Sequence, residues 1–387
     1  MGAKRMNTHH NLYRKLQQEI NKMPIAFSET TSGVELKLLQ RLFTPTEAEI
    51  ALNLNIMPES LDRIHKRVHK SGITITKADL EDVLDNLVRK GAIMGGRVFE
   101  SKGKGKKYSL AQLVIGMFEF QVDRLNRGFV EDFEQYVNEQ FHRDILRSKT
   151  KQMRTIPVSR AVTPDLRVEP YNDIKEYVRN LSDDIAVANC VCRQSADVIG
   201  NPCRHSQIRE TCLMFSDAAR FGIGRGAARP ITKEEALVIL DRAEEAGFIL
   251  QPQNAREPQF VCCCCIDCCH ALKVFKMHPQ PSSLFISNYY VTIDRSQCKG
   301  CKKCVDRCGM GAISMENKVA VINHDRCIGC GVCVAACVND AHRMHKKDKT
   351  HIPPKTHDDM YKKIMIERFG LGSTLRTVSK VLTGRKA

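Results

Sequence analysis

One cysteine spacing, CxxCxxCxxxC, occurs twice within a short segment of this chain. The first copy runs from Cys298 to Cys308 and the second from Cys327 to Cys337. A loop this tight supplies three thiolates from one piece of backbone, so the fourth ligand of a four-metal cluster must come from elsewhere. Two such runs are typical of paired 4Fe-4S clusters, in which the fourth cysteine of each run ligates the other cluster. The segment is therefore expected to fold as one compact, pseudo-symmetric module.

This crossing divides the eight cysteines into two ligand sets. The first set is Cys298, Cys301, Cys304 and Cys337, and the second is Cys327, Cys330, Cys333 and Cys308. A disulfide or zinc framework explains the pattern poorly, because zinc has no need of a doubled eight-cysteine repeat. Between the runs, residues 311–322 read as a helical turn, a polar turn and an alternating strand, which suits a compact module.

The segment resembles the bacterial dicluster ferredoxins over residues of about 288 to 345. Such ferredoxins usually carry proline after the fourth cysteine of each run, whereas Gly309 and Val338 stand there in this chain. The ligand pattern survives this departure, but the family's backbone rigidity and cluster potentials do not carry over to this chain. The resemblance implies a ferredoxin-like domain with two 4Fe-4S clusters at residues 285–345.

Length and composition bound the class of protein. The chain has 387 residues, enough for two or three domains, and 18 cysteines. So many cysteines indicate a disulfide scaffold only in a short secreted chain, and the first residues show no apolar core behind their charges. No apolar run is long enough to span a bilayer. We therefore expect a cytoplasmic, reduced protein, and exposed clusters point to an anaerobic or low-oxygen setting.

The net charge of +16 distinguishes this chain from small soluble ferredoxins, which are usually acidic. A basic surface favours acidic partners: a redox protein, nucleic acid or an anionic membrane surface. Half of the excess lies in the tail, where twelve Lys or Arg stand against four acids from Arg343 onward. An apolar helical stripe in this tail, Leu375, Val378, Val381 and Leu382, is expected to dock on protein or to make peripheral membrane contact.

The N-terminal region reads as consecutive short helices followed by a hairpin. A capping box with proline at the first helical position, Thr44–Glu47, opens one helix. Leu61, Ile64 and Val68 recur at helical spacing, and a third helix runs from near Thr76 to a stop at Gly91.

The hairpin would form a basic wing after the third helix. Residues 97–100 and 108–110 flank a glycine-lysine turn at residues 102–107, which predicts a winged-helix-like domain over residues 30–124. Winged helices often bind DNA. The third helix, however, carries Asp79, Glu81, Asp82 and Asp85, and these acids would face phosphates with the wrong sign. We therefore expect protein docking or dimerisation here, not nucleic-acid binding.

Ten further cysteines fall into two groups in the middle of the chain. Residues 185–193 read as a buried strand that ends in two cysteines, Cys190 and Cys192. Together with Cys203 and Cys212 they make up the first group. The second group is Cys262, Cys263, Cys264, Cys265, Cys268 and Cys269. Adjacent thiols are reactive and pack poorly, so a metal site is the natural explanation. All of them except Cys263 are candidate ligands of at least one further iron-sulfur cluster; a zinc site and a redox-active disulfide are the alternatives.

The whole layout resembles a group of multidomain 4Fe-4S proteins from anaerobic microbes, over most of residues 30 to 340. The matching elements are the Cys190-Val-Cys192-Arg193 sequence, the string from Cys262 to Cys269, Ser287-Asn288 and the ferredoxin run. Asp267 stands where such strings often continue with cysteine, which alters the expected ligation. The architecture implied is α+β and multidomain: the winged-helix-like domain, a cysteine-rich α/β middle domain at 125–284, the ferredoxin domain and a basic helical tail at 346–387.

These features predict an iron-sulfur electron-transfer protein that acts as a subunit or dedicated partner of a larger low-potential redox complex. Electrons would pass between the two ferredoxin clusters and a cluster in the middle domain. The alternatives are a reductive activase of a metalloenzyme and a redox-sensing DNA-binding regulator. An electron-transfer subunit of an oxidoreductase fits the chain better than a stand-alone enzyme, since no catalytic residue set is evident. The expected partners are redox proteins or enzyme subunits with acidic surfaces.

Overall fold

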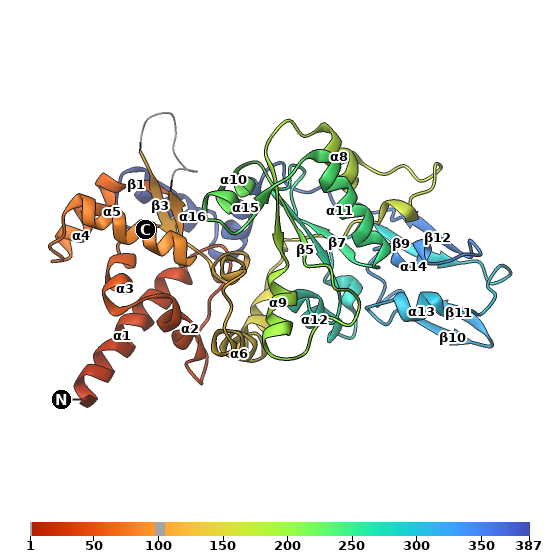
Figure 1. Ribbon diagram of the computed structural model, residues 1–387, viewed down its shortest axis with the longest axis horizontal. Helices are drawn as coiled ribbons and strands as arrows, with labels where there is room; N and C mark the ends of the chain where they lie inside the picture. The colour runs from red at the N-terminus through yellow and green to blue at the C-terminus, as the bar shows by residue number, and fades with distance from the viewer. Residues whose placement is uncertain (1, 97–104) are drawn as a thin grey trace. The chain divides into compact units, whose positions relative to one another are not determined.

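The computed structural model describes residues 2–96 and 105–387, with side chains described from residue 10 onward in those ranges. The chain divides into two compact units. Unit 1 comprises residues 1–150 and 361–387, and unit 2 comprises residues 151–360. The architecture mixes helices and sheets throughout (Figure 1). The finer domain boundaries given above stay predictions.

Unit 1 is mainly helical. Its helices are α1 (Gly2–Ile20), α2 (Val34–Leu42), α3 (Pro45–Ala51), α4 (Leu61–Lys70), α5 (Lys77–Lys90), α6 (Arg127–Tyr136), α7 (His142–Arg147) and α16 (Leu371–Leu382). The predicted capping box is confirmed. The Thr44 side chain accepts a hydrogen bond from the Glu47 amide, and the Glu47 carboxylate accepts one from the Thr44 amide. Thr76 caps α5, and Gly91 ends it with a φ of 72°, in the left-handed region that favours glycine.

A small antiparallel sheet follows these helices in the order β1 (Glu59–Ser60), β3 (Lys107–Leu110), β2 (Ile93–Gly96). The predicted strand at 97–100 and the start of the glycine-lysine turn lie outside the described residues. Asp85 of α5 accepts hydrogen bonds from the Tyr108 hydroxyl and from Lys106, at 2.7 and 2.5 Å. The acids of the third helix therefore neutralise a lysine of the hairpin within the same unit.

Unit 2 is built on a five-stranded sheet in the order β6 (Arg229–Pro230), β4 (Ile185–Asn189), β5 (Glu210–Phe215), β8 (Phe260–Cys264), β7 (Ile249–Pro252). Every neighbouring pair is antiparallel. The expected α/β class for the middle region is therefore wrong: parallel neighbours are lacking in this sheet, because β5 runs between β4 and β8 in the opposite direction. Its helices are α8 (Ile174–Asn180), α9 (Val191–Val198), α10 (Ser216–Gly224), α11 (Lys233–Glu245) and α12 (His270–Lys276).

Strand direction in this sheet brings distant cysteines to one end. Strands β4 and β8 are both antiparallel to β5, so they run the same way and their C-terminal ends emerge at the same edge. The start of β5 lies at that edge too. Helices α9 and α12, which follow the two strand ends, lie at this end of the sheet (Figure 1). Both cysteine groups of the middle region are thereby carried to one place.

The ferredoxin segment forms two further antiparallel strand pairs in unit 2. Strand β9 (Tyr289–Ile293) pairs with β12 (His342–Lys346), and β10 (Ile313–Glu316) pairs with β11 (Val319–Ile322). Helices α13 (Lys303–Arg307) and α14 (Val332–Ala335) follow the two cysteine loops. The helical turn expected after residue 311 is wrong. Asn317 and Lys318 both have positive φ, so they form a two-residue hairpin turn that pairs the residues on either side as strands.

Helix α15 (His357–Phe369) leads to the C-terminal helix α16. The apolar stripe predicted on α16 is only partly covered: Val381 is buried, whereas Leu375 and Leu382 are 59% and 65% exposed. Among the described residues, we find no helix that combines the length and the apolar character needed to cross a membrane.

Candidate metal centres

The two predicted ferredoxin ligand sets line two separate cavities. Cys308 lies with Cys327, Cys330 and Cys333 around one cavity. Cys337 lies with Cys298, Cys301 and Cys304 around the other. The fourth cysteine of each run therefore lies beside the first three cysteines of the other run, as crossed ligation requires.

Local backbone geometry explains why glycine stands inside both cysteine loops. Gly300 and Gly329 have φ values of 68° and 65°. A Cβ at Gly300 would lie 2.4 Å from the Lys318 carbonyl oxygen, and one at Gly329 would lie 2.1 Å from that of Tyr289. Only glycine allows these loops to curl against the neighbouring strands.

Backbone hydrogen-bond donors point at two of the predicted cluster ligands. The Ala312 amide donates to Cys308 Sγ at 3.2 Å, and the Ala320 amide donates to Cys298 Sγ at 3.4 Å. His342 lines the cavity of the first ligand set, the one that contains Cys298, and is 5% exposed. Neither of its ring nitrogens has a hydrogen-bond partner among the described residues. Donors of this kind suit a group rich in sulfur, so the cavity fits a 4Fe-4S cluster.

The residue after Cys308 packs against the middle region. A Cβ at Gly309 would lie 2.9 Å from Ile266 Cβ. Val338, at the equivalent place after Cys337, is 69% exposed. The departure from proline at Gly309 therefore has a structural reason, since the close approach of the turn after β8 leaves no room for a larger residue.

Six of the ten middle cysteines form one continuous set of neighbouring thiols, which we call the six-thiol group. Following the contacts from one thiol to the next, its members are Cys212, Cys262, Cys264, Cys269, Cys192 and Cys190. Cys212 and Cys262 are direct cross-strand partners of β5 and β8. The set combines residues from β4's end, β5, β8 and the starts of α9 and α12, and four thiols of such a set can ligate a cubane.

Cys263 is set apart from this group by the alternation of a strand. Side chains of successive residues in β8 point to opposite faces, so Cys263 faces away from Cys262 and Cys264. Burial raises the pKa of Cys263 to about 12, as expected for a thiol that is protonated and inert.

Arg193 gives the middle cysteines an unusual electrostatic environment. Its side chain is 0% exposed and stacks on Phe248, 4.0 Å from the ring centroid. It donates to Thr211 Oγ1 and to the Cys263 carbonyl, and it interacts electrostatically with the thiols of Cys190 and Cys264 of the six-thiol group and of Cys265 outside it. Among the described residues no carboxylate pairs with it. A buried cation needs a compensating anion, and metal-bound thiolates would supply one.

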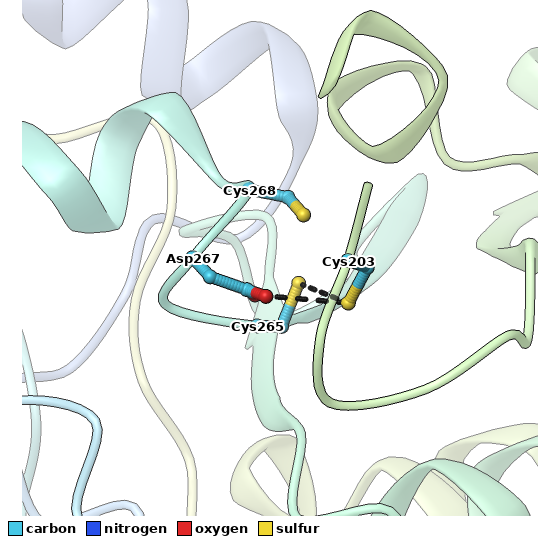
Figure 2. A group of neighbouring side chains, drawn as sticks. All are labelled: Cys203, Cys265, Asp267 and Cys268. Carbon is cyan, nitrogen blue, oxygen red and sulfur yellow. Dashed lines mark hydrogen bonds between the residues drawn. The ribbon is translucent and has the colours of Figure 1, made fainter. Parts of the chain in front are cut away.

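The remaining three candidates, Cys203, Cys265 and Cys268, gather around Asp267 (Figure 2). One donor atom from each of the four residues lies within 4.8 Å of all the others. Sequence reasoning treated Asp267 as a missing cysteine and did not include it among the ligands. The signal was its position inside the cysteine string, two residues after Cys265. His205 lies at the rim, with Nε2 3.9 Å from Asp267 Oδ1.

Cysteines of the ferredoxin segment and of the middle region line the same cavity. The cavity of the second ferredoxin set is also lined by Cys264 of the six-thiol group and by Cys265. Both regions belong to unit 2, so this proximity lies within one compact body.

Comparison with known proteins agrees with this geometry where it applies. Residues 290–338 match the family model of a 4Fe-4S dicluster domain. No curated protein matches the chain, and no solved structure matches it. The matched segment holds all eight ferredoxin cysteines, so the chain contains a ferredoxin-type domain that binds two 4Fe-4S clusters, and its other cysteines allow more.

Proposed function

We propose that this protein is an electron-transfer component of a larger low-potential redox system, relaying electrons between its ferredoxin clusters and a third cluster in the middle region. The cavity wall shared by the second ferredoxin set and Cys264 carries this proposal. Clusters held on both sides of such a wall lie in one compact unit, where fast electron exchange needs no motion of the chain.

The third cluster is proposed on the six-thiol group. Six neighbouring thiols supply the four ligands of a cubane with two to spare. Arg193 supports this assignment, because neutral thiols cannot compensate a fully buried guanidinium whereas ligated thiolates can. A cluster bound there would supply one-electron chemistry. The thiolates and Arg193 would set the net charge of the site.

The first ferredoxin set is the proposed contact point for an external redox partner. Cys301 is exposed, and the exposed lysines Lys299, Lys302 and Lys303 surround it at the cavity rim. A ring of positive charge around an accessible cluster favours a partner with an acidic surface and speeds its encounter. We therefore propose that electrons pass from the cluster of the first ferredoxin set to that of the second and on to the cluster of the six-thiol group, or along the same path in reverse.

Of the alternatives, the DNA-binding regulator has the least support. Lys106 of the hairpin is 3.0 Å from Glu81 and 2.5 Å from Asp85, so its charge is used within unit 1. The proposed role of this winged-helix-like region is docking to another protein. A reductive activase would need an iron with an open coordination position, which a group of six thiols does not favour.

Iron analysis of anaerobically purified protein tests the third cluster. We expect about twelve irons per wild-type chain and about eight in a Cys190→Ser, Cys192→Ser, Cys264→Ser variant, with the ferredoxin EPR signals retained. Cys263→Ala is the matched control, because this thiol lies on the opposite face of β8, and it should keep all twelve. About eight irons in the wild type would refute the relay.

A further inference from the structure

We propose that Cys203, Cys265, Asp267 and Cys268, here called the Cys3Asp group, bind a single tetrahedral zinc ion and do not ligate an iron-sulfur cluster. This goes beyond the relay, because it removes three thiols from the candidate cluster ligands and assigns them a redox-inert metal. It also gives Asp267 a role as the fourth ligand, in the position where the string lacks a cysteine.

Donor distances carry the proposal. Cys203 Sγ lies 3.6 Å from Cys265 Sγ and 3.7 Å from Asp267 Oδ1. Four donors arranged tetrahedrally about 2.3 Å from zinc lie about 3.8 Å apart. The four side chains converge on one point from a loop on one side and a turn on the other (Figure 2). The group is therefore already arranged for one ion.

The ferredoxin sets of the same chain provide an internal comparison. Thiolates of a cubane bind four separate irons, so they are spread around the cluster. No three ferredoxin cysteines come within 4.8 Å of one another, and they surround cavities instead. Among the described residues, the Cys3Asp group alone meets that close spacing. The difference indicates a single ion in one place and clusters in the other two.

The carboxylate is held in place by the backbone. The Arg204 amide donates to Asp267 Oδ2 at 2.8 Å, which leaves Oδ1 turned toward the thiols. A metal-binding carboxylate is commonly oriented in this way through its second oxygen. The thiols of Cys203, Cys265 and Cys268 are buried, so the group offers a closed site of three sulfurs and one oxygen.

The proposed ion would act as a structural tie. Cys203 belongs to the connection between α9 and β5, while Cys265, Asp267 and Cys268 form the turn between β8 and α12. Cys264 and Cys269 of the six-thiol group flank that turn directly. Zinc would therefore tie the two segments to each other, while Cys212, Cys262 and Cys264 of the neighbouring group are held independently by the paired strands β5, β8 and β7.

Metal analysis of the full-length protein tests the proposal. Anaerobic wild-type protein should contain about one zinc per chain, and zinc X-ray absorption should show three sulfurs at about 2.3 Å and one oxygen at about 2.0 Å. Zinc should be lost from a Cys203→Ser, Asp267→Asn variant while its iron content stays at the wild-type value. Cys263→Ala should keep both metals.

Three outcomes would overturn the site: no zinc in the wild type, zinc ligated by four sulfurs, or loss of iron in the double variant. The spectrum needs no substitution, so the test holds even if the double variant does not fold. Failure of the relay has a different signature, namely about eight irons with the zinc still present.

Discussion

The ferredoxin segment and the middle region both concentrate cysteines, but they do so by different means. The ferredoxin segment carries its predicted ligands in two contiguous loops, and its repeat predicts which thiols line each cavity. The middle region draws on four separate places in the chain, which the antiparallel sheet brings together. Residue spacing therefore identifies a candidate metal site that one loop builds, whereas strand topology decides which residues meet when several elements contribute.

The largest expected difference concerns Arg193. Arg193→Met should reduce the iron content by about four per chain and leave the ferredoxin signals intact, because the thiolates of the proposed third cluster would lose a buried countercharge. Iron analysis with EPR checks this. Arg209→Met is the matched control, since Arg209 makes a partly exposed ion pair with Asp197. Equal iron in both variants would show that the middle thiols need no such cation.

The contact between Gly309 of the ferredoxin segment and Ile266 of the middle region leaves no room for an added methyl group. Gly309→Ala should destabilise unit 2 by about 1–3 kcal/mol, because its Cβ would overlap Ile266. Denaturant unfolding of the anaerobic protein measures the loss. Val338→Ala, at the equivalent exposed place in the other half, should change stability by less than about 0.5 kcal/mol. If both substitutions are neutral, Gly309 does not pack as tightly as the structure shows.

The lysines around Cys301 are expected to guide an acidic redox partner to the ferredoxin segment. Replacing Lys299, Lys302 and Lys303 by glutamine should slow reduction by an acidic redox protein on the order of tenfold at low salt, with the difference shrinking as salt rises. Stopped-flow reduction at several ionic strengths measures it. Replacing Arg376 and Lys380 of α16 changes the net charge with less effect on a cluster-directed encounter. A slowing that is identical for both sets would place docking elsewhere.

The smallest effect is expected at His342. His342→Phe removes the imidazole at the first cavity, and loss of a hydrogen bond to cluster sulfur should shift one ferredoxin potential to a more negative value. A redox titration followed by EPR resolves the two clusters. The second cluster should keep its potential, because His342 does not line its cavity. A shift in both would indicate a general change in structure.

Prediction from sequence succeeded where the signal was local. The capping box at Thr44 and the α5 helix from Thr76 to Gly91 follow from neighbouring residues, and the structure contains them. The strand predicted over residues 185–193 is present only to Asn189, because helix α9 begins at Val191. The helical turn after residue 311 was mispredicted because a two-residue turn at Asn317 and Lys318 overrides the local pattern. The α/β class failed because pairing direction is not written in any one strand.

The two ferredoxin clusters can be predicted from the sequence alone, because all eight candidate ligands lie in one doubled spacing and three of every four come from a single loop. Only the tertiary structure decided how the other ten cysteines are divided. Pairing of β4, β5 and β8 places six thiols in one group, turns Cys263 to the opposite face and leaves three thiols with Asp267. The physical reason is that metal ligation depends on distances between side chains, and for residues far apart in the chain the packing of strands sets those distances.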